Sequence, residues 1–233
     1  MATIDMKRIR NIVLMGHSGS GKTSLAEAML YLSGGSDRLG KISEGNTVFD
    51  FDPEAIRRKI SVASSQAPLM WKDIKINLID TPGYPGFTGE VSQAVRVADS
   101  ALILVDAKAG IQVGTELAWD KAEEAGLPKA IFINKFDDNE ARFRKLLNAL
   151  HEKFGRSICP LTIPMVQDGT VKGTIDLVAK EAHSFDEKGT HHVLPIPEEN
   201  MEDVEEFREM LLEAVAGTSE DLMNKYFGGS LAV

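Results

Sequence analysis

This sequence of 233 residues has little cysteine, few aromatic residues and no long apolar run. Cys159 is the single cysteine, which excludes an internal disulfide and is typical of a small buried apolar side chain. The apolar run within residues 1–16 has the length of one strand, too short for a signal peptide or a bilayer-spanning helix. We therefore expect a cytoplasmic protein with no membrane partner.

Positive charge is also scarce, because 26 Lys and Arg stand against 35 Asp and Glu and give a net charge of −9. Neutralising the phosphates of a nucleic acid requires clustered basic side chains. We therefore expect no DNA partner, and any contact with RNA would need a local basic patch. The 43% of apolar residues is ordinary for a globular protein, and the length suffices for one large domain or two small ones.

Apolar strands alternate with helices in the first part of the chain. The predicted strands are 10–15, 74–80, 101–106 and 128–135, and the predicted helices are 22–32, 88–98, 114–125 and 138–154. Such alternation predicts an α/β fold with a mostly parallel sheet covered by helices on both faces. Ligands of these sheets bind at the carboxyl ends of the strands. Residues 34–59 show weak periodicity and are expected to form a mobile loop.

The pattern changes near residue 157. Short strands are predicted at 159–166, 171–177 and 180–185, followed by an acidic helix from about Glu198 and a last helix at 219–227 with Ser219 as its cap. This predicts a second, smaller α+β unit. His191 and His192 are expected in a turn or an exposed strand, and Trp71 and Trp119 in the core or near the nucleotide switch.

The segment GHSGSGKT, residues 16–23, fits the phosphate-loop pattern G-x-x-x-x-G-K-[ST] between a strand and a helix. Backbone N–H groups in such a loop, together with the helix N-terminus, attract polyphosphate. Lys22 would place its charge on the β- and γ-phosphates, and the Thr23 hydroxyl suits Mg²⁺. The predicted phosphate-binding residues are His17, Ser18, Gly19, Ser20, Gly21, Lys22, Thr23 and Ser24.

Two further loops follow strands of the same predicted sheet. Asp80 ends one strand, and we expect it to hold Mg²⁺, while the N–H of Gly83 would reach a γ-phosphate. Asn134, Lys135 and Asp137 follow another strand in the pattern N-K-x-D. The Asp137 carboxylate can accept two hydrogen bonds from the donor edge of guanine, which adenine lacks. The three loops therefore predict a single site for GTP or GDP with Mg²⁺ and disfavour an ATP-using kinase.

At these residues the sequence resembles the translational GTPases, specifically the N-terminal part of elongation factor G. The similar stretches are GHSGSGKTSL, INLIDTPGYPGFTGEVSQAVRVADSALILVDAKAGIQVGTELAW and IFINKFDDNEARF. Residues 157–227 resemble the insert domain of that factor. The resemblance implies a GTPase domain at 1–157 and an insert domain at 158–233. It also implies a ribosome-stimulated GTPase in translocation or recycling, whose full-length protein would contact the stalk protein and large-subunit RNA.

Several positions depart from the pattern of that family. Tyr84 stands where the family carries a histidine that orients the attacking water, Gly19 replaces an aspartate, and Lys59 replaces a glycine. Ser61 keeps a hydroxyl that can bind Mg²⁺. Tyr84 could position water by hydrogen bonding but, with a phenol pKa of about 10, not act as a base. We therefore predict slow intrinsic hydrolysis, with Tyr84, Lys22 and Gly83 as the catalytic candidates.

Three functional alternatives stay open at this point. The changes at Gly19 and Tyr84 resemble accessory, elongation factor G-like paralogues. They are also compatible with a GTP-controlled binding module that hydrolyses little, or with a ribosome-protection GTPase of the tetracycline-resistance type. The family continues after the insert with one more strand, a base-contacting loop and a closing helix. We therefore expect a fragment in which the strand at 128–133 is an exposed sheet edge.

Overall fold

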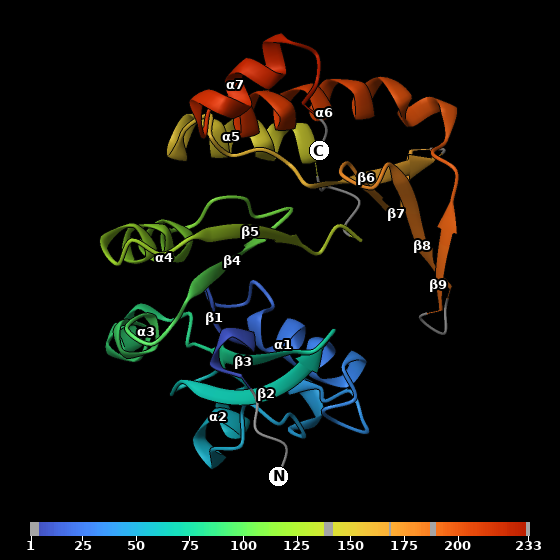
Figure 1. The fold of residues 1–233 in the computed structure, drawn as a ribbon. Helices are drawn as coiled ribbons and strands as arrows, with labels where there is room; N and C mark the ends of the chain where they lie inside the picture. The colour runs from blue at the N-terminus through green and yellow to red at the C-terminus, as the bar shows by residue number, and fades with distance from the viewer. Residues whose placement is uncertain (1–4, 138–141, 168, 187–189, 232–233) are drawn as a thin grey trace. The chain divides into compact units, whose positions relative to one another are not determined.

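The computed structural model describes residues 5–137, 142–167, 169–186 and 190–231. The chain forms two compact units, Met1–Asn134 and Lys135–Val233. The first unit contains a five-stranded sheet and the second a four-stranded sheet (Figure 1).

The sheet of the first unit is mostly parallel, as the sequence predicts. Its strands are β1 (Ile9–Gly16), β2 (Ser65–Trp71), β3 (Ile74–Asp80), β4 (Ser100–Asp106) and β5 (Lys129–Asn134). They follow the order β2-β3-β1-β4-β5, and β2 alone runs antiparallel to its neighbour. Among the described residues β5 has no further neighbour, so it is the edge strand that the sequence predicts.

Helices cover both faces of this sheet: α1 (Lys22–Leu32) lies on one face, and α3 (Thr88–Val95) and α4 (Val113–Glu124) lie on the other. The unit also contains α2 (Pro53–Arg58) and the short 3₁₀ turns η1 (Met6–Arg8), η2 (Ile42–Glu44) and η3 (Pro85–Phe87). Along β1, Val13 and Met15 pack with α3 and α4, while Leu14 packs with α1 on the other face. Burial on both sides explains why the strand is apolar at consecutive positions.

The strand register brings the expected functional loops to one edge of the sheet. Asp80 at the end of β3 is paired with Leu14 of β1, and Gly16 at the end of β1 is paired with Leu104 of β4. Asn134 ends β5 beside Asp106 of β4. Because these strands are parallel, their carboxyl ends meet on one rim, which is where such sheets bind ligands.

One strand of this unit was missed, and one expectation for it is wrong. Strand β2 was not predicted: its burial alternates, with Ala67 and Leu69 buried, but it contains Pro68, which an edge strand tolerates because its outer N–H groups need no partner. Its last residue, Trp71, is 54% exposed, so it does not pack in the core, whereas Trp119 is partly buried against it.

The segment 34–59 is not simply a loop, since it contains η2 and α2. Helix α2 is marked in the sequence by its polar capping residue and not by an apolar pattern. The Asp52 side chain accepts a hydrogen bond from the N–H of Glu54, and Pro53 occupies the first helical position.

The second unit packs helices on one face of an antiparallel sheet. Its strands, in spatial order, are β6 (Thr162–Gln167), β7 (Thr170–Asp176), β8 (Glu181–Phe185) and β9 (His191–Leu194). Its helices are α5 (Phe143–Phe154), η4 (Glu198–Asn200), α6 (Met201–Ala216) and α7 (Glu220–Phe227). Ile163, Met165 and Ile175 of the sheet form its core with Leu147 of α5 and Phe207 of α6.

Most expectations for this unit are confirmed. The three predicted strands are present, Ser219 caps α7, and His191 and His192 lie in the exposed strand β9. The predicted helix at 138–154 begins at Phe143 within the described residues. Positions 138–141 lie outside them, and so does Asp168, which with Gly169 has the sequence of a turn between the first two predicted strands. Helix α5 belongs to the second compact unit. The domain boundary at 157 stays a prediction.

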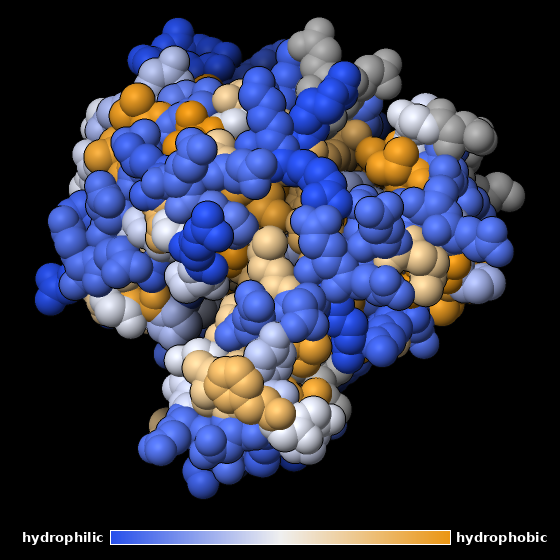
Figure 2. All heavy atoms as spheres, turned by 90° about the horizontal axis from the view of Figure 1, so that it is seen from above, coloured by the Kyte–Doolittle hydropathy of each residue, from blue (hydrophilic) through white to orange (hydrophobic). Residues whose placement is uncertain are grey.

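In the described part of the chain, no helix has the length and apolarity needed to cross a bilayer. Figure 2 shows one face, on which hydrophilic residues predominate and hydrophobic residues appear in small separate groups. This is an ordinary surface for a folded domain.

Candidate nucleotide-binding site

The phosphate loop connects Gly16, the last residue of β1, to the first turn of α1. Gly21 precedes α1 with φ 98°, and a Cβ atom at this position would lie 2.2 Å from Nδ2 of Asn134. Only glycine combines this backbone conformation with this approach. The first N–H groups of an α-helix lack partners within the helix, so the loop presents donors and a positive dipole end together. Ser24 is exposed on this first turn.

Lys22 is buried at the base of the loop. Its Nζ donates to the carbonyl oxygens of Gly16, at 3.0 Å, and His17, at 2.8 Å. Burial lowers the pKa of Lys22 to about 8, against the opposing effect of the Asp80 carboxylate. An ammonium has three donors, and these carbonyls use two of them. An anion at this position would relieve the cost of burying the charge, which is the expected arrangement for a phosphate.

Asp80, Thr23 and Ser61 lie together at the same rim. The Thr23 hydroxyl donates to Oδ2 of Asp80 at 2.6 Å and lies 3.1 Å from Oγ of Ser61. Asp80 is 1% exposed, and its Oδ1 has no hydrogen-bond partner among the described residues. Burial raises the pKa of Asp80 to about 7, although the Thr23 hydrogen bond and Lys22 lower it.

This set of atoms fits Mg²⁺. The cation prefers hard oxygen ligands, and the three side chains offer two hydroxyls and a carboxylate. A divalent charge would stabilise the ionised form of a carboxylate that burial otherwise disfavours. Thr23, Ser61 and Asp80 are therefore the residues that would hold the ion.

The backbone of Gly83 lies against the phosphate loop. A Cβ atom at Gly83 would lie 2.5 Å from Nζ of Lys22 and 2.6 Å from the backbone nitrogen of Ser18. A side chain at this position would collide with the loop, so glycine allows the switch backbone to reach the expected γ-phosphate position.

Asn134 ties the end of β5 to the phosphate loop. Its Nδ2 donates to the carbonyl oxygen of Ser20 at 2.9 Å. Lys135 follows with φ 63°. Asp137 lies in the second compact unit, where it lines a hollow of about 800 Å³ with Arg142 and Phe143. The roles of Lys135 and Asp137 in base recognition stay predictions.

Tyr84 is 52% exposed and follows Gly83 at the start of η3. It forms part of the wall of a hollow of about 30 Å³ with Gly114, Leu117 and Val91. Its proposed role in orienting water stays a prediction.

The sequence analysis missed one contact and two buried acids at the site. Nδ1 of His17 accepts the N–H of Gly114 at 3.2 Å and so links the loop to the start of α4. Glu27 is 0% exposed and Asp50 is 6% exposed, and both add negative charge around Asp80. Glu27 has a feature that could have been recognised, because it is the one acidic residue of α1 and stands among apolar residues in the stretch LAEAML. Asp50 carries no comparable signal.

The fold and these contacts define a phosphate-loop nucleotide-binding domain. Residues 7–217 match the family described as Elongation factor Tu GTP binding domain. The crystal structure of a protein from Thermus thermophilus is similar, with a TM-score of 0.91 and 39% sequence identity. The match covers 97% of this chain and 34% of that protein, so this chain spans about a third of its length.

The match covers most of the chain, and the chain therefore belongs to the family of elongation factor Tu GTP-binding domains. It is the GTP-binding domain of a translational GTPase.

Proposed function

We propose that this chain is the GTP-binding and GTP-hydrolysing domain of a ribosome-associated, elongation factor G-like translation factor in the cytoplasm, acting with Mg²⁺ in translocation or recycling. The observation that carries the proposal is the presence of two buried, oppositely charged side chains, Lys22 and Asp80, at one rim of the sheet. Each charge is incompletely balanced by protein groups, and magnesium with a nucleotide triphosphate would balance both.

The chain's own groups suggest how hydrolysis proceeds. Lys22 and the N–H groups of the phosphate loop would hold the β- and γ-phosphate oxygens and stabilise the charge that develops there. The Gly83 N–H would bind the γ-phosphate, and the Tyr84 hydroxyl would orient a water molecule. That water attacks phosphorus, the bond to the β-phosphate oxygen breaks, and GDP and phosphate leave. A bound Mg²⁺ would supply positive charge to the same oxygens.

Base recognition is tested with the Asp137→Asn variant and fluorescent GDP and XDP. Xanthine carries an oxygen where guanine carries its amino group, so it suits the amide of the variant. We expect wild type to prefer GDP and the variant to prefer XDP. An unchanged preference would refute recognition by this carboxylate.

Hydrolysis is tested by single-turnover measurements with and without ribosomes. A translational GTPase is expected to hydrolyse GTP slowly alone and faster with ribosomes. Binding without stimulated hydrolysis would favour the alternative of a GTP-controlled binding module, which Tyr84 and Gly19 support.

The Tyr84→His variant tests the water-orienting role. Histidine can accept a proton near neutral pH, which a phenol cannot. We expect a higher stimulated rate with unchanged GDP affinity. A rate equal to or below that of wild type would count against an orienting role for position 84.

A further inference from the structure

Glu27 is a fully buried acid in the middle of α1, one helical turn after Thr23. Its Oε1 accepts two backbone hydrogen bonds, from the N–H of Val48 at 2.6 Å and from that of Phe49 at 3.1 Å. Hydrogen bonds to a charged acceptor are about twice as strong as neutral ones. Residues 48–49, 21 and 22 positions away in sequence, are thereby attached to the helix that begins at the phosphate loop.

The segment folds closely around this carboxylate. A Cβ atom at Gly40 would lie 2.2 Å from Oε2 of Glu27 and 2.8 Å from Cα of Thr47. The Thr47 hydroxyl accepts the N–H of Asp50 at 3.1 Å, and the Phe49 side chain is buried in the core beside α1. The attachment therefore combines charged hydrogen bonds with apolar packing.

The attached residues lead directly to the expected metal ligands. Asp50 follows Phe49; burial raises the pKa of its carboxyl, and the nearby Ser61 hydroxyl lowers it. Oγ of Ser61 lies 3.1 Å from Oγ1 of Thr23. A chain of contacts thus leaves α1 at Glu27, passes through Asp50 and Ser61, and returns to α1 at Thr23.

We propose that Glu27 is a positioning residue that anchors the switch segment, residues 40–61, on α1 and so places Asp50 and the expected magnesium ligand Ser61 beside Thr23 and Asp80. This inference rests on the proposed function, because it assigns Glu27 to the same site. Oε2 of Glu27 has no hydrogen-bond partner in the described part of the chain, although it is buried. Burying a carboxylate lowers the stability of the fold, and in this position the buried carboxylate fixes the segment on α1.

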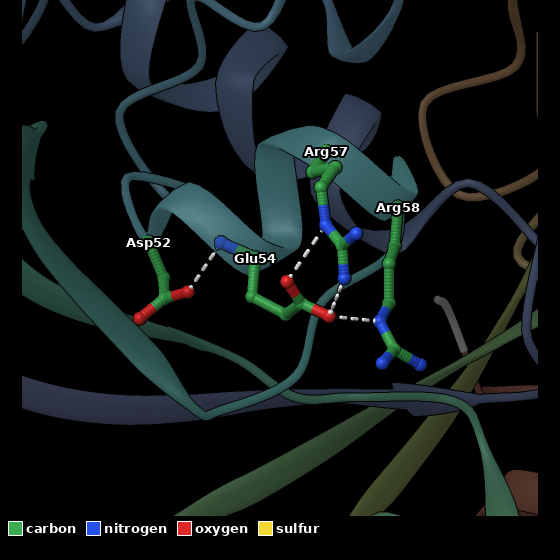
Figure 3. Close-up of polar contacts among 4 residues, drawn as sticks. All are labelled: Asp52, Glu54, Arg57 and Arg58. Atoms are coloured by element: carbon green, nitrogen blue, oxygen red, sulfur yellow. Dashed lines mark hydrogen bonds and ion pairs between the residues drawn. The ribbon is translucent and has the colours of Figure 1, made fainter.

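The same segment contains acids with a different role. In α2, Glu54 is bonded to Arg57 at 2.7 and 2.9 Å and also to Arg58, and all of these side chains are more than a third exposed (Figure 3). Exposed pairs of this kind contribute little. Glu44 in η2 is likewise an exposed acid, paired with Lys41 at 3.2 Å, and it serves as the matched control.

The anchor is tested on the full chain by limited trypsin digestion without nucleotide, followed at the exposed Arg57, Arg58 and Lys59. We expect Glu27→Ala to raise the cleavage rate there by at least about tenfold, because both charge-assisted hydrogen bonds that Oε1 accepts are lost. Glu27→Gln keeps an acceptor oxygen and should lie between wild type and Glu27→Ala. Glu44→Gln should cleave at the wild-type rate.

The positioning role is tested by the Mg²⁺ concentration needed to retain fluorescent GDP. Glu27→Ala should require about tenfold more Mg²⁺, because the magnesium ligand Ser61 is no longer held in position. Glu44→Gln should match wild type. Wild-type cleavage in Glu27→Ala would overturn the anchor, and faster cleavage with unchanged Mg²⁺ dependence would overturn the positioning role.

Gly40→Ala keeps the proposal testable if Glu27→Ala does not fold, which circular dichroism would show. The added methyl group collides with the anchor from the side of the segment, while the carboxylate remains. Gly89→Ala is its control, because a Cβ there has no heavy atom within 4 Å. Of these two glycine variants, we expect only Gly40→Ala to raise the cleavage rate and the Mg²⁺ concentration needed to retain GDP. Wild-type values of both quantities in Gly40→Ala would contradict the proposal. Failure of all GDP binding would refute the proposed function, while the trypsin assay would still test the anchor.

Discussion

The two compact units differ in how far their charged side chains are buried and in how completely those charges are paired. The first unit buries Lys22, Asp80 and Glu27 around the phosphate loop and leaves oxygens of both acids without hydrogen-bond partners among the residues described. The second unit keeps Arg144 about half exposed and bonds its guanidinium to Glu206 at 2.8 Å and also to Asp203. Buried, incompletely paired charge indicates a ligand site, whereas paired charge at a surface indicates a structural contact.

The structural character of the Arg144 cluster is clear from its partners. The Glu206 and Asp203 hydrogen bonds raise the pKa of Arg144, and Arg144 in turn lowers the pKa of Glu206. The guanidinium also lies 4.8 Å above the ring of Phe207, whose side chain is buried in the core. The cluster therefore joins α5 to α6 and has its charges balanced within the protein.

The largest effect is expected for Lys22→Met. The variant loses the cation that would hold phosphate, so GDP affinity should fall about 100-fold, equivalent to about 3 kcal/mol. It also removes a buried charge whose pKa burial lowers to about 8, so the free protein should melt no lower than wild type. Calorimetric titration and thermal melting measure the two quantities. A lower melting temperature with intact GDP binding would reverse this assignment.

Intermediate effects are expected where glycine permits close backbone packing. A Cβ at Gly114 would lie 2.5 Å from Cα of His17, and one at Gly173 would lie 2.0 Å from the carbonyl oxygen of His183. Each alanine substitution should cost about 1–3 kcal/mol of unfolding free energy. Gly114→Ala should also weaken GDP binding because it displaces the phosphate loop, while Gly173→Ala should not. Equal GDP affinities in the two variants would contradict the expectation that only Gly114 supports the phosphate loop.

The smallest effect is expected for Arg144→Met. Exposed ion pairs contribute up to about 1 kcal/mol, so the melting temperature should fall by only a few degrees. GDP affinity should be that of wild type, because the charge serves packing of α5 and α6. Thermal melting in low and high salt measures the effect, which screening should reduce. A loss of GDP affinity would show that the second unit's charges also serve the site.

The sequence predicted the parts of the fold that depend on local pattern. The apolar runs of β1, β3 and β4 read directly as buried strands, and GHSGSGKT marked the turn between β1 and α1. It missed β2, whose place is set by pairing with β3 rather than by its own composition. It also missed α2, which begins at polar capping residues.

What the sequence by itself determined is the set of short segments whose chemistry is contiguous, namely the phosphate loop, the Asp80 turn and the N-K-x-D pattern. What only the tertiary structure decided is which distant groups share a buried space. Asn134 bonds to Ser20 across 114 positions, and Glu27 bonds to residues 48–49 across a segment with no apolar period. The physical reason is that a side chain's burial and partners depend on the packing of the whole sheet and its helices, which no local pattern encodes.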